Sequence, residues 1–345
     1  MPLAKDHRVP ELPYDALLVV SFGGPERPED VLPFLENVLR GKNVPRERML
    51  KVAEHYHHCG GRSPINDQNR QLIAALTRAL DARGPRLPIY WGNRNWHPLL
   101  PDVLRQMASD GRRRALAFFT SAYSSYSGCR QYRENIADAQ QAVGPAAPRV
   151  DKLRVFYNHP LFIEVMTDRV TAALEALPAA SRDRASLVFT AHSIPASMAA
   201  TSQYEAQLRE ACALVAQSFP EHAWQLAFQS RSGPPHQPWL APDVCDALRH
   251  LASHEARDVV VVPIGFLSDH LEVLYDLDVE VRRVADELGL TMIRAGTAGA
   301  DPKFVEMIRE LILERLEPNR PRRAIGTRGA SHDECPTDCC PRPGK

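Results

Sequence analysis

The chain has 345 residues, of which 44% are hydrophobic and 24% are charged, and this is the composition of a globular protein with a sizeable core. Its 42 basic residues balance 42 acidic ones, so the formal net charge of zero gives no indication of a general nucleic-acid binder. No apolar run reaches the length of a membrane span, and the N-terminus lacks the apolar stretch and cleavage site of a signal peptide, so we expect a cytoplasmic protein without a transmembrane segment.

Short apolar runs, each followed by a polar or Gly/Pro turn, predict β-strands along the whole chain. They lie at residues 15–22, 87–91, 114–121, 152–157, 186–193, 224–230, 258–266 and 290–296. Helical patterns lie between them, at residues 70–82, 97–111 and 161–177 among others. Strands that alternate with helices are typical of βαβ units, and the nearly continuous apolar character of these strands favours parallel sheets covered on both faces. The predicted fold class is therefore α/β.

The two halves of the chain resemble each other. The segment "LLVVSFGGPE" near the start is similar to "LVFTAHSIPAS" in the middle, and "ALAFFTSAYSSYSG" is similar to "VVVVPIGFLSDHLE" at the same relative place. We therefore predict two similar α/β lobes, residues 1–150 and 151–316, followed by an irregular Cys-rich tail at 317–345. In open α/β sheets the functional groups lie just beyond the carboxyl ends of the strands, so we expect the site residues there.

An acidic pattern follows the strand predicted at 258–266. Asp269, Glu272, Asp276 and Glu280 are spaced by three, four and four residues, which places them on one face of a helix with a Ser-Asp start. On an exposed helix this pattern is only a solvated face. In a buried position the same carboxylates conduct a divalent cation or relay protons, because burial and mutual repulsion raise some of their pKa values.

His192 lies at the carboxyl end of the strand predicted at 186–193, where a neutral imidazole can accept protons or hold a metal ion. A single histidine is more often a structural hydrogen-bonding group, so this residue alone leaves both interpretations open. The segment "HYHHCGG" at 55–61 lacks the spacing of a common zinc motif and is more simply explained as the end of a helix. Tyr123 and Trp239, in Gly- or Pro-rich loops, either pack in the core or line a flat apolar ligand site.

Six segments, in order, resemble the ferrochelatase family: "SFGGPE", "GGRSPIN", "GNRNWHP", "TAHSIP", "QSRSGPPHQPWL" and "PIGFLSDHLEVLYDLD". The resemblance covers about residues 14–316. It implies the class II chelatase fold, in which two Rossmann-like lobes, each a parallel β-sheet flanked by helices, enclose a cleft. It also implies a lyase that forms a nitrogen–metal bond by inserting ferrous iron into a porphyrin in haem biosynthesis.

The resemblance assigns roles to polar residues in these segments. His192 matches the histidine that accepts pyrrole protons or binds the incoming iron in the family, and Glu272 matches the catalytic glutamate that faces it across the porphyrin. These two residues are therefore the expected contacts of the substrate iron. Asp276 matches a second acid on the metal or proton path, and Arg94 matches an arginine of the pocket.

Three aromatic positions complete the implied porphyrin pocket. Tyr123 and Trp239 match aromatic residues near the macrocycle. Phe22 stands where some bacterial members have a tyrosine that approaches the metal, and this departure argues against a tyrosine-assisted mechanism here.

Residues 33–50 match the lip over the pocket and resemble actinobacterial-type members. Membrane-associated relatives have a more apolar lip, whereas this one carries Arg40, Lys42, Arg46 and Arg48. Basic residues suit coproporphyrin III, which has four propionates, better than protoporphyrin IX, which has two. A solvated helix end would explain the same residues, so coproporphyrin III is favoured and protoporphyrin IX remains open.

Three of the seven cysteines, Cys335, Cys339 and Cys340, lie in the last eleven residues. In the cytosol such clusters more often bind metal or do redox chemistry than form disulfides. The resemblance implies a [2Fe–2S] cluster, with Cys129 as the ligand from the body of the chain and the tail cysteines as the others. The tail is then expected to fold back on the first lobe near Cys129. A zinc site made by the same thiolates and a tail without metal are the alternatives.

Two other functions stay open at this point. A sister chelatase of the same fold would insert cobalt or nickel into another tetrapyrrole, and a non-catalytic protein would only hold haem or another tetrapyrrole. The expected partners are a porphyrin and ferrous iron, with no nucleic acid and at most a peripheral membrane contact. We expect a monomer or a weak dimer.

Overall fold

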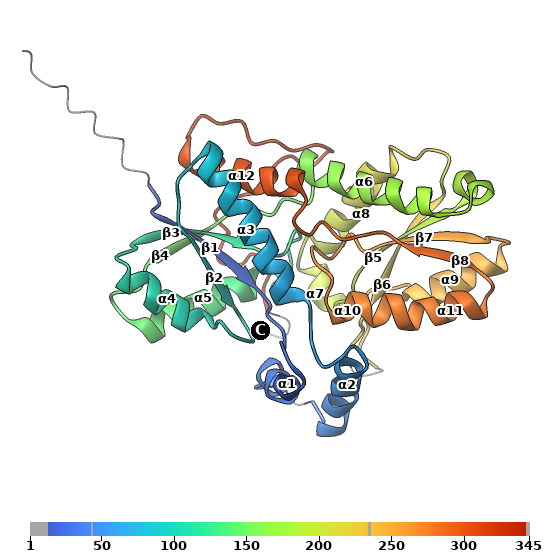
Figure 1. The fold of residues 1–345 in the computed structure, drawn as a ribbon, viewed down its shortest axis with the longest axis horizontal. Helices are drawn as coiled ribbons and strands as arrows, with labels where there is room; N and C mark the ends of the chain where they lie inside the picture. The colour runs from blue at the N-terminus through green and yellow to red at the C-terminus, as the bar shows by residue number, and fades with distance from the viewer. Residues whose placement is uncertain (1–12, 43, 234–235, 343–345) are drawn as a thin grey trace, which may run out of the picture.

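The computed structural model describes residues 13–42, 44–233 and 236–342. Within these ranges the chain forms two parallel four-stranded sheets with helices packed around them (Figure 1). The first sheet has the order β2-β1-β3-β4 and contains β1 (Ala16–Ser21), β2 (Ile89–Asn93), β3 (Arg114–Phe119) and β4 (Arg149–Lys152). The second has the order β6-β5-β7-β8 and contains β5 (Ser186–His192), β6 (Trp224–Gln229), β7 (Asp258–Val262) and β8 (Thr291–Arg294). The two orders are equivalent, as the internal sequence similarity predicts.

Helices alternate with these strands along the chain. They are α1 (Val31–Leu39), α2 (Arg46–His58), α3 (Ile65–Arg83), α4 (Leu100–Ser109), α5 (Gln131–Val143), α6 (Pro160–Ala176), α7 (Ala196–Ala200), α8 (Tyr204–Ala216), α9 (Val244–Ser253), α10 (Leu271–Leu274), α11 (Arg282–Glu287) and α12 (Pro302–Leu316). Two π-helical turns, η2 (Tyr126–Arg130) and η4 (Asp276–Val281), and two 3-10 turns, η1 (Pro28–Asp30) and η3 (Ala179–Arg184), complete the regular structure of the described ranges.

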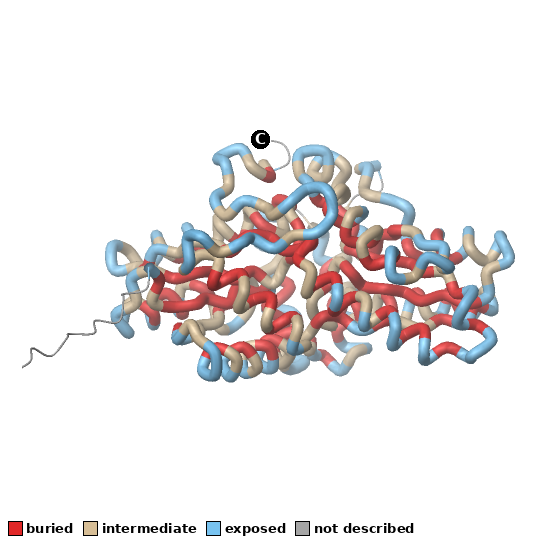
Figure 2. Tube along the Cα trace, turned by 90° about the horizontal axis from the view of Figure 1, so that it is seen from above, coloured by how far each residue is buried: buried red, intermediate tan, exposed pale blue. Residues whose placement is uncertain are grey.

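The strands carry the core, as their apolar sequences predict. Every residue of β1 and of β7 is buried, and the buried segments run through the middle of both lobes with the exposed ones outside (Figure 2). Burying one Val or Leu side chain contributes about 1.5–3 kcal/mol, so these sheets form rigid supports for the loops at their carboxyl ends.

One predicted strand differs from the structure, and the predicted lobe boundary lies close to it. The apolar run at 152–157 was expected to be a strand, but β4 ends at Lys152, and the run then leaves the sheet. Its residues are buried between helices, where Arg154 pairs with Glu314 of α12 at 2.7 Å. The boundary predicted at residue 150 falls inside β4. Helix α12, assigned to the second lobe, packs against α3 of the first as well as against α6 (Figure 1).

Helices α1 and α2 project from the two sheets as an arm (Figure 1), which contains the segment predicted as a lip. The arm has its own small core, in which Phe34 and Tyr56 pack with Leu271 of α10. Nη1 of Arg48 donates to the carbonyl oxygen of Gly233 at 3.4 Å, so the arm also reaches the second lobe. Arg40 ends α1 and is exposed.

The described part of the tail, residues 317–342, contacts both lobes. The amide of Thr327 donates to Glu210 of α8 in the second lobe, and the amide of Ile325 donates to the carbonyl oxygen of Asn158 at 3.0 Å. Further on, Nη1 of Arg130 in the first lobe donates to the carbonyl oxygen of Thr337 at 2.9 Å. Within the described ranges, no helix has both the length and the apolar character that a membrane span requires.

Candidate active site and tail cysteine site

The carboxyl end of β5 and the start of α10 bring His192 and Glu272 together. Nε2 of His192 lies 3.4 Å from Oε1 of Glu272. The two side chains are 33% and 38% exposed, so the pair is accessible to a substrate. The rest of β5 is almost entirely buried, and the sheet therefore sets the position of the imidazole.

Hydrogen bonds on either side fix the His192 ring and its backbone. Nδ1 donates to the carbonyl oxygen of Ser193, because a carbonyl group can only accept. Nε2 is therefore the nitrogen that exchanges a proton with Glu272. The hydroxyl of Tyr204 donates to the carbonyl oxygen of His192 at 3.0 Å and holds the end of the strand in place.

The pair shares one proton at neutral pH. Burial by itself lowers the pKa of His192, but the charge of Glu272 and the hydrogen bond to it outweigh burial and raise this pKa to about 9. Burial by itself raises the pKa of Glu272, but the nearby imidazolium lowers it to about 2. The free site thus holds an imidazolium beside a carboxylate near neutral pH, and not the neutral imidazole that the sequence led us to expect.

Helix α10 begins at a histidine cap and not at the expected Ser-Asp start. Nδ1 of His270 accepts a hydrogen bond from the amide of Glu272 at 3.2 Å. An accepting Nδ1 carries no proton, and burial lowers the pKa of His270, so this ring is neutral. Asp269 instead pairs with Arg294 of β8 at 3.3 Å. This cap fixes the backbone amide of Glu272, the residue whose side chain faces His192.

The acidic segment is not the continuous α-helix that its spacing predicts. One turn of α10 is followed by the π-helical turn η4, and π-helical turns are frequent at functional sites. Asp276, the first residue of η4, accepts a hydrogen bond from the hydroxyl of Ser230. Ser230 has a φ of 61°, a left-handed conformation that costs about 1–3 kcal/mol for a non-glycine residue and that occurs mainly at ligand sites.

Asp276 is a group of this site that titrates near neutral pH. Burial raises its pKa to about 7, the hydrogen bond from Ser230 opposes this shift, and repulsion from Glu272 and Glu280 adds to it. The structure therefore keeps three of the four predicted acids in one electrostatic group. Asp269 leaves the group because it is paired with Arg294.

Phe22, Arg94 and Lys42 form a second group, on the side of the first lobe. Phe22 follows β1, is 38% exposed, and packs edge-on against Phe34 of the arm with ring centroids 6.2 Å apart. The guanidinium of Arg94 lies 5.8 Å from the centre of the Phe22 ring and 4.4 Å from that of Tyr132. Desolvation of its ammonium group, with repulsion from Arg94, lowers the pKa of Lys42, so these two cations lie near each other. An aromatic face beside two cations suits a flat apolar molecule with carboxylates on its rim.

Trp239 and Tyr123, both expected near the macrocycle, have different environments. The backbone of Trp239 pairs with that of Pro195, three residues beyond His192, and its Nε1 has no hydrogen-bond partner among the described residues. Tyr123 is only 2% exposed, and its hydroxyl donates to the carbonyl oxygen of Ile264 at 3.1 Å. The structure therefore places Tyr123 in the core, where it joins the two lobes, and not at the accessible surface.

A buried amide network supports the loops of the first lobe, and we did not predict it. Nδ2 of Asn93 donates to Oδ1 of Asn66 at 3.3 Å and to the carbonyl oxygen of His97 at 3.0 Å. Nδ2 of Asn66 donates to Glu26 at 2.9 Å. These residues come from the segments "SFGGPE", "GGRSPIN" and "GNRNWHP", so the network holds the loop that carries Arg94. Asparagine close to a Gly- or Pro-rich turn in two of the three segments is the signal that could have revealed it.

The tail brings its cysteines to Cys129 of the first lobe. Cys129 lies in the π-helical turn η2 and is 3% exposed. A hydrogen bond between Cys129 and Cys335 raises the pKa of the first thiol and lowers that of the second. Sγ of Cys339 lies 3.7 Å from Sγ of Cys340. The ligand atoms of Cys335 and Cys339 also lie within 4.8 Å of each other, so the four thiols form one continuous group that offers the four ligands of a [2Fe–2S] cluster.

Two features around these thiols fit a negatively charged metal centre. Cys340 has a φ of 53°, and this left-handed turn lets adjacent thiols face one site, although neighbouring side chains in an extended chain point apart. Nε and Nη2 of Arg133 on α5 are buried, and neither has a hydrogen-bond partner in the described ranges. Arg133 and Cys335 both line a cavity of about 190 Å³ between the first lobe and the tail. Such orphaned donors suit the sulfur atoms of a cluster, so the donor set fits the implied group.

Residues 14–316 match the ferrochelatase family. The chain belongs to this family. Relatives that it resembles include the ferrochelatase of Rhodopirellula baltica, which is 58% identical over 329 residues that cover 95% of this chain and 93% of the relative. The coproporphyrin III ferrochelatase of Streptomyces coelicolor is 52% identical over 351 residues, covering 95% and 94%. That of Nocardia farcinica is 52% identical over 341 residues, covering 94% and 96%. The enzyme class predicted from the sequence, a metal chelatase, is thereby confirmed.

Solved structures confirm the predicted fold of this ferrochelatase. SirB from Bacillus subtilis with Fe3+ has a TM-score of 0.55 and 10% identity, over 91% of this chain and 100% of that one. The sirohydrochlorin chelatase SirB from Bacillus subtilis subspecies spizizenii in complex with cobalt has a TM-score of 0.53 and 11% identity, over 89% and 97%. At such identities the likeness concerns the chelatase fold alone.

Proposed function

We propose that this ferrochelatase inserts ferrous iron into coproporphyrin III between His192, Glu272 and Asp276 of the second lobe and Phe22 and Arg94 of the first. The observation that carries the proposal is the accessible His192–Glu272 pair with a carboxyl group behind it that titrates near neutral pH. Insertion of a metal releases two protons from the inner nitrogens of a porphyrin, so the reaction needs acceptors of this kind.

The arrangement supports an order for the proton transfers. Ferrous iron that approaches Glu272 repels the imidazolium of His192 and lowers its pKa. The proton on Nε2 then passes to Asp276, which is ionised in about half of the molecules near pH 7, and from there to water. The neutral Nε2 of His192 can now accept a proton from the porphyrin. Phe22 contributes an apolar ring to this site and offers no hydroxyl group to the metal.

The cations beside Phe22 support the choice of porphyrin. Lys42 and Arg94 lie close enough to repel each other, and Arg40 is exposed nearby in sequence. A carboxylate between Lys42 and Arg94 would relieve that repulsion and gain charge-assisted hydrogen bonds. Four propionates occupy such positions more fully than two do. The names of several relatives, such as those from Streptomyces and Nocardia, agree with this choice.

Removal of the Lys42 charge is expected to discriminate between the two porphyrins. We expect Lys42→Ala to raise KM for coproporphyrin III roughly tenfold, because a charge-assisted hydrogen bond is lost, and to raise KM for protoporphyrin IX less than about threefold. Steady-state kinetics with both porphyrins measures this, with Arg105→Ala on the outer surface of α4 as the control. An equal change in both KM values would contradict a propionate contact at Lys42.

The titration of Asp276 is expected to appear in the pH profile. Its pKa is raised to about 7, so the carboxylate is protonated below this pH and ionised above it. Because only the ionised form attracts iron or accepts a proton, kcat/KM should rise about tenfold per pH unit below pH 7 and level off above it. Asp276→Asn should remove this step from the profile measured between pH 5.5 and 8.5. A step that persists in Asp276→Asn would belong to another group.

We also propose that Cys129, Cys335, Cys339 and Cys340 hold a [2Fe–2S] cluster. The grouping of the four thiols and the buried Arg133 donors without partners among the described residues support this cluster, and analysis for zinc and acid-labile sulfide distinguishes it from a zinc ion held by the same thiolates. When bound, the cluster supplies a covalent link between tail and first lobe and a one-electron redox centre. Because the tail also contacts Glu210 of α8, the link would clamp both lobes.

The cytoplasmic location and a monomeric or weakly dimeric state remain predictions.

A further inference from the structure

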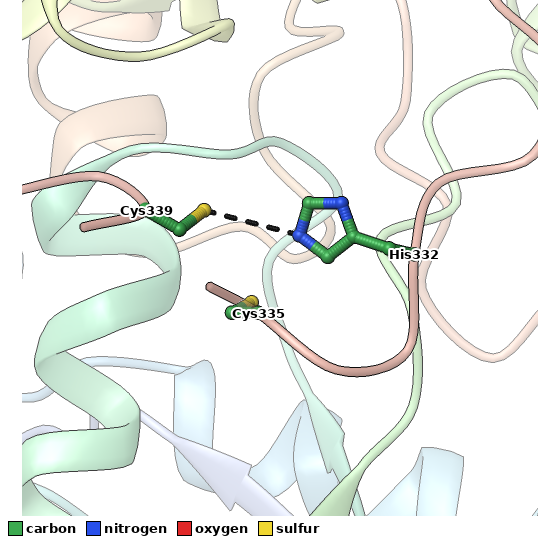
Figure 3. A group of neighbouring side chains, drawn as sticks. All are labelled: His332, Cys335 and Cys339. Carbon is green, nitrogen blue, oxygen red and sulfur yellow. Dashed lines mark hydrogen bonds between the residues drawn. The ribbon is translucent and has the colours of Figure 1, made fainter. Parts of the chain in front are cut away.

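A histidine of the tail, His332, lies beside the tail cysteines. Nε2 of His332 is 3.8 Å from Sγ of Cys339 (Figure 3). The same ring hydrogen-bonds to Cys335, which contributes to the lowered pKa of that thiol. The ring nitrogen and the two sulfur atoms all lie within 4.8 Å of one another. Among the residues described, the neighbourhood thus offers five donors, where a [2Fe–2S] cluster requires four.

Contacts with the rest of the protein hold the chain at His332 in place. Nζ of Lys152 on β4 donates to the backbone carbonyl oxygen of His332 at 3.3 Å. The next residue, Asp333, pairs with Arg322 at 3.3 Å and with Arg315 of α12 at 3.7 Å. The chain at His332 and Asp333 is therefore anchored to the first lobe and to α12. Such anchors reduce the entropy that the side chain would lose when it meets a metal centre.

The geometry distinguishes the thiols by their relation to this ring. Cys335 and Cys339 contact His332. Cys340 instead contacts Cys339, and Cys129 contacts Cys335. Two ligands of a tetrahedral zinc or iron site lie about 3.8 Å apart when each bond is about 2.3 Å long. The separations of 3.7 Å between Cys339 and Cys340 and of 3.8 Å between Cys339 and His332 both match this value. The imidazole thus lies next to the position of Cys339.

We propose that His332 is a fifth donor of the tail cysteine site, which hydrogen-bonds to the thiolates of Cys335 and Cys339 and replaces Cys339 as a metal ligand when that thiol is lost. The inference rests on the cluster proposed above. Imidazole is an established ligand of [2Fe–2S] iron and raises the reduction potential when it replaces thiolate. In this exchange a nitrogen lone pair of His332 forms the bond to iron that the thiolate of Cys339 forms in the wild type, and no oxidation state changes.

Alanine variants of two adjacent cysteines test the inference, with and without His332. We expect Cys339→Ala, isolated without oxygen, to keep more than about half of the wild-type iron and acid-labile sulfide. The double variant Cys339→Ala/His332→Ala should keep less than about a tenth. Cys340 contacts Cys339 and does not belong to the group that His332 forms with Cys335 and Cys339, so Cys340→Ala should lose the cluster whether or not His332 is present. Pulsed EPR of reduced Cys339→Ala should show the strong nitrogen coupling of a directly bound imidazole, which is absent from the wild type, where His332 is only hydrogen-bonded.

A variant that leaves all cysteines in place keeps the test independent of folding. His332→Ala should retain the cluster but show a more negative reduction potential than wild type, because a hydrogen bond to the thiolates is gone, while the exposed control His254→Ala should not. An unchanged potential in His332→Ala, or loss of the cluster from a folded Cys339→Ala, would overturn the inference. A wild-type protein without iron and sulfide would overturn the cluster proposal and this inference with it.

Discussion

Glu272→Gln is expected to lower kcat for iron insertion by more than about 100-fold, with a change in KM of less than about threefold. The amide keeps the size of the side chain but removes the charge that organises the proton on His192. It also removes the carboxylate that attracts ferrous iron. His192→Ala should cause a loss of similar size, because Nε2 is the proposed acceptor of a porphyrin proton. Anaerobic steady-state kinetics, with the product followed by absorbance, measures both effects.

A spectroscopic measurement separates this account from a merely structural role of Glu272. Because Glu272 raises the pKa of His192 to about 9, loss of its charge should return that pKa toward or below its ordinary value. An NMR titration of the His192 ring in Glu272→Gln shows the shift directly. Glu287→Gln, an exposed change on α11, serves as the matched control. Unchanged kinetics in Glu272→Gln would exclude the acid–base pair as the site of the reaction.

Cys129→Ala is expected to remove the [2Fe–2S] cluster that we propose for the tail. Without the buried thiol of the first lobe, no thiol remains at its position, and His332 lies beside Cys339 instead. The visible absorbance, iron and sulfide of the purified protein should therefore fall below about a tenth of wild type. Because a metal centre stabilises the folded state that binds it, thermal unfolding should begin roughly 5 °C lower. The value of kcat should change less than about threefold, since none of the four cysteines belongs to the His192–Glu272 group.

The control for this change is Cys245→Ala, a half-buried cysteine on α9 of the second lobe. It removes a thiol without touching the tail and should leave the cofactor content unchanged. A wild-type level of iron and sulfide in Cys129→Ala would show that this residue is not a ligand. Stoichiometric zinc in the wild-type protein, without sulfide, would favour the zinc site over the cluster.

The fold could be predicted from sequence because its strands are buried on both faces and their apolar runs stand out. Both sheets and the position of His192 at the end of β5 follow from that pattern. The apolar run at 152–157 was wrongly predicted as a strand, because its apolar side chains pack in the core between the two lobes and not in a sheet. A short apolar run shows that a segment is buried, but it does not show whether the backbone of that segment is hydrogen-bonded in a β-sheet.

The candidate site could be predicted in part. The spacing of the acidic residues indicated Glu272 and Asp276. The acidic segment is divided into α10 and the π-helical turn η4, and the His270 cap and the Ser230–Asp276 hydrogen bond that accompany this division cannot be read from the periodicity of the sequence. The protonated state of His192 follows from a 3.4 Å contact between residues 80 positions apart in the chain. Arg133 escaped notice for a similar reason, since its relation to the tail arises only when the chain folds back.

The protein's central property is tested most directly by ferrous iron insertion measured without oxygen for coproporphyrin III and protoporphyrin IX side by side. The structure predicts a kcat/KM that is more than about tenfold higher for coproporphyrin III, together with loss of that activity in Glu272→Gln. Equal or greater efficiency with protoporphyrin IX would contradict the assigned substrate. Insertion of cobalt or nickel into another tetrapyrrole, with no iron insertion into either porphyrin, would contradict the assigned reaction.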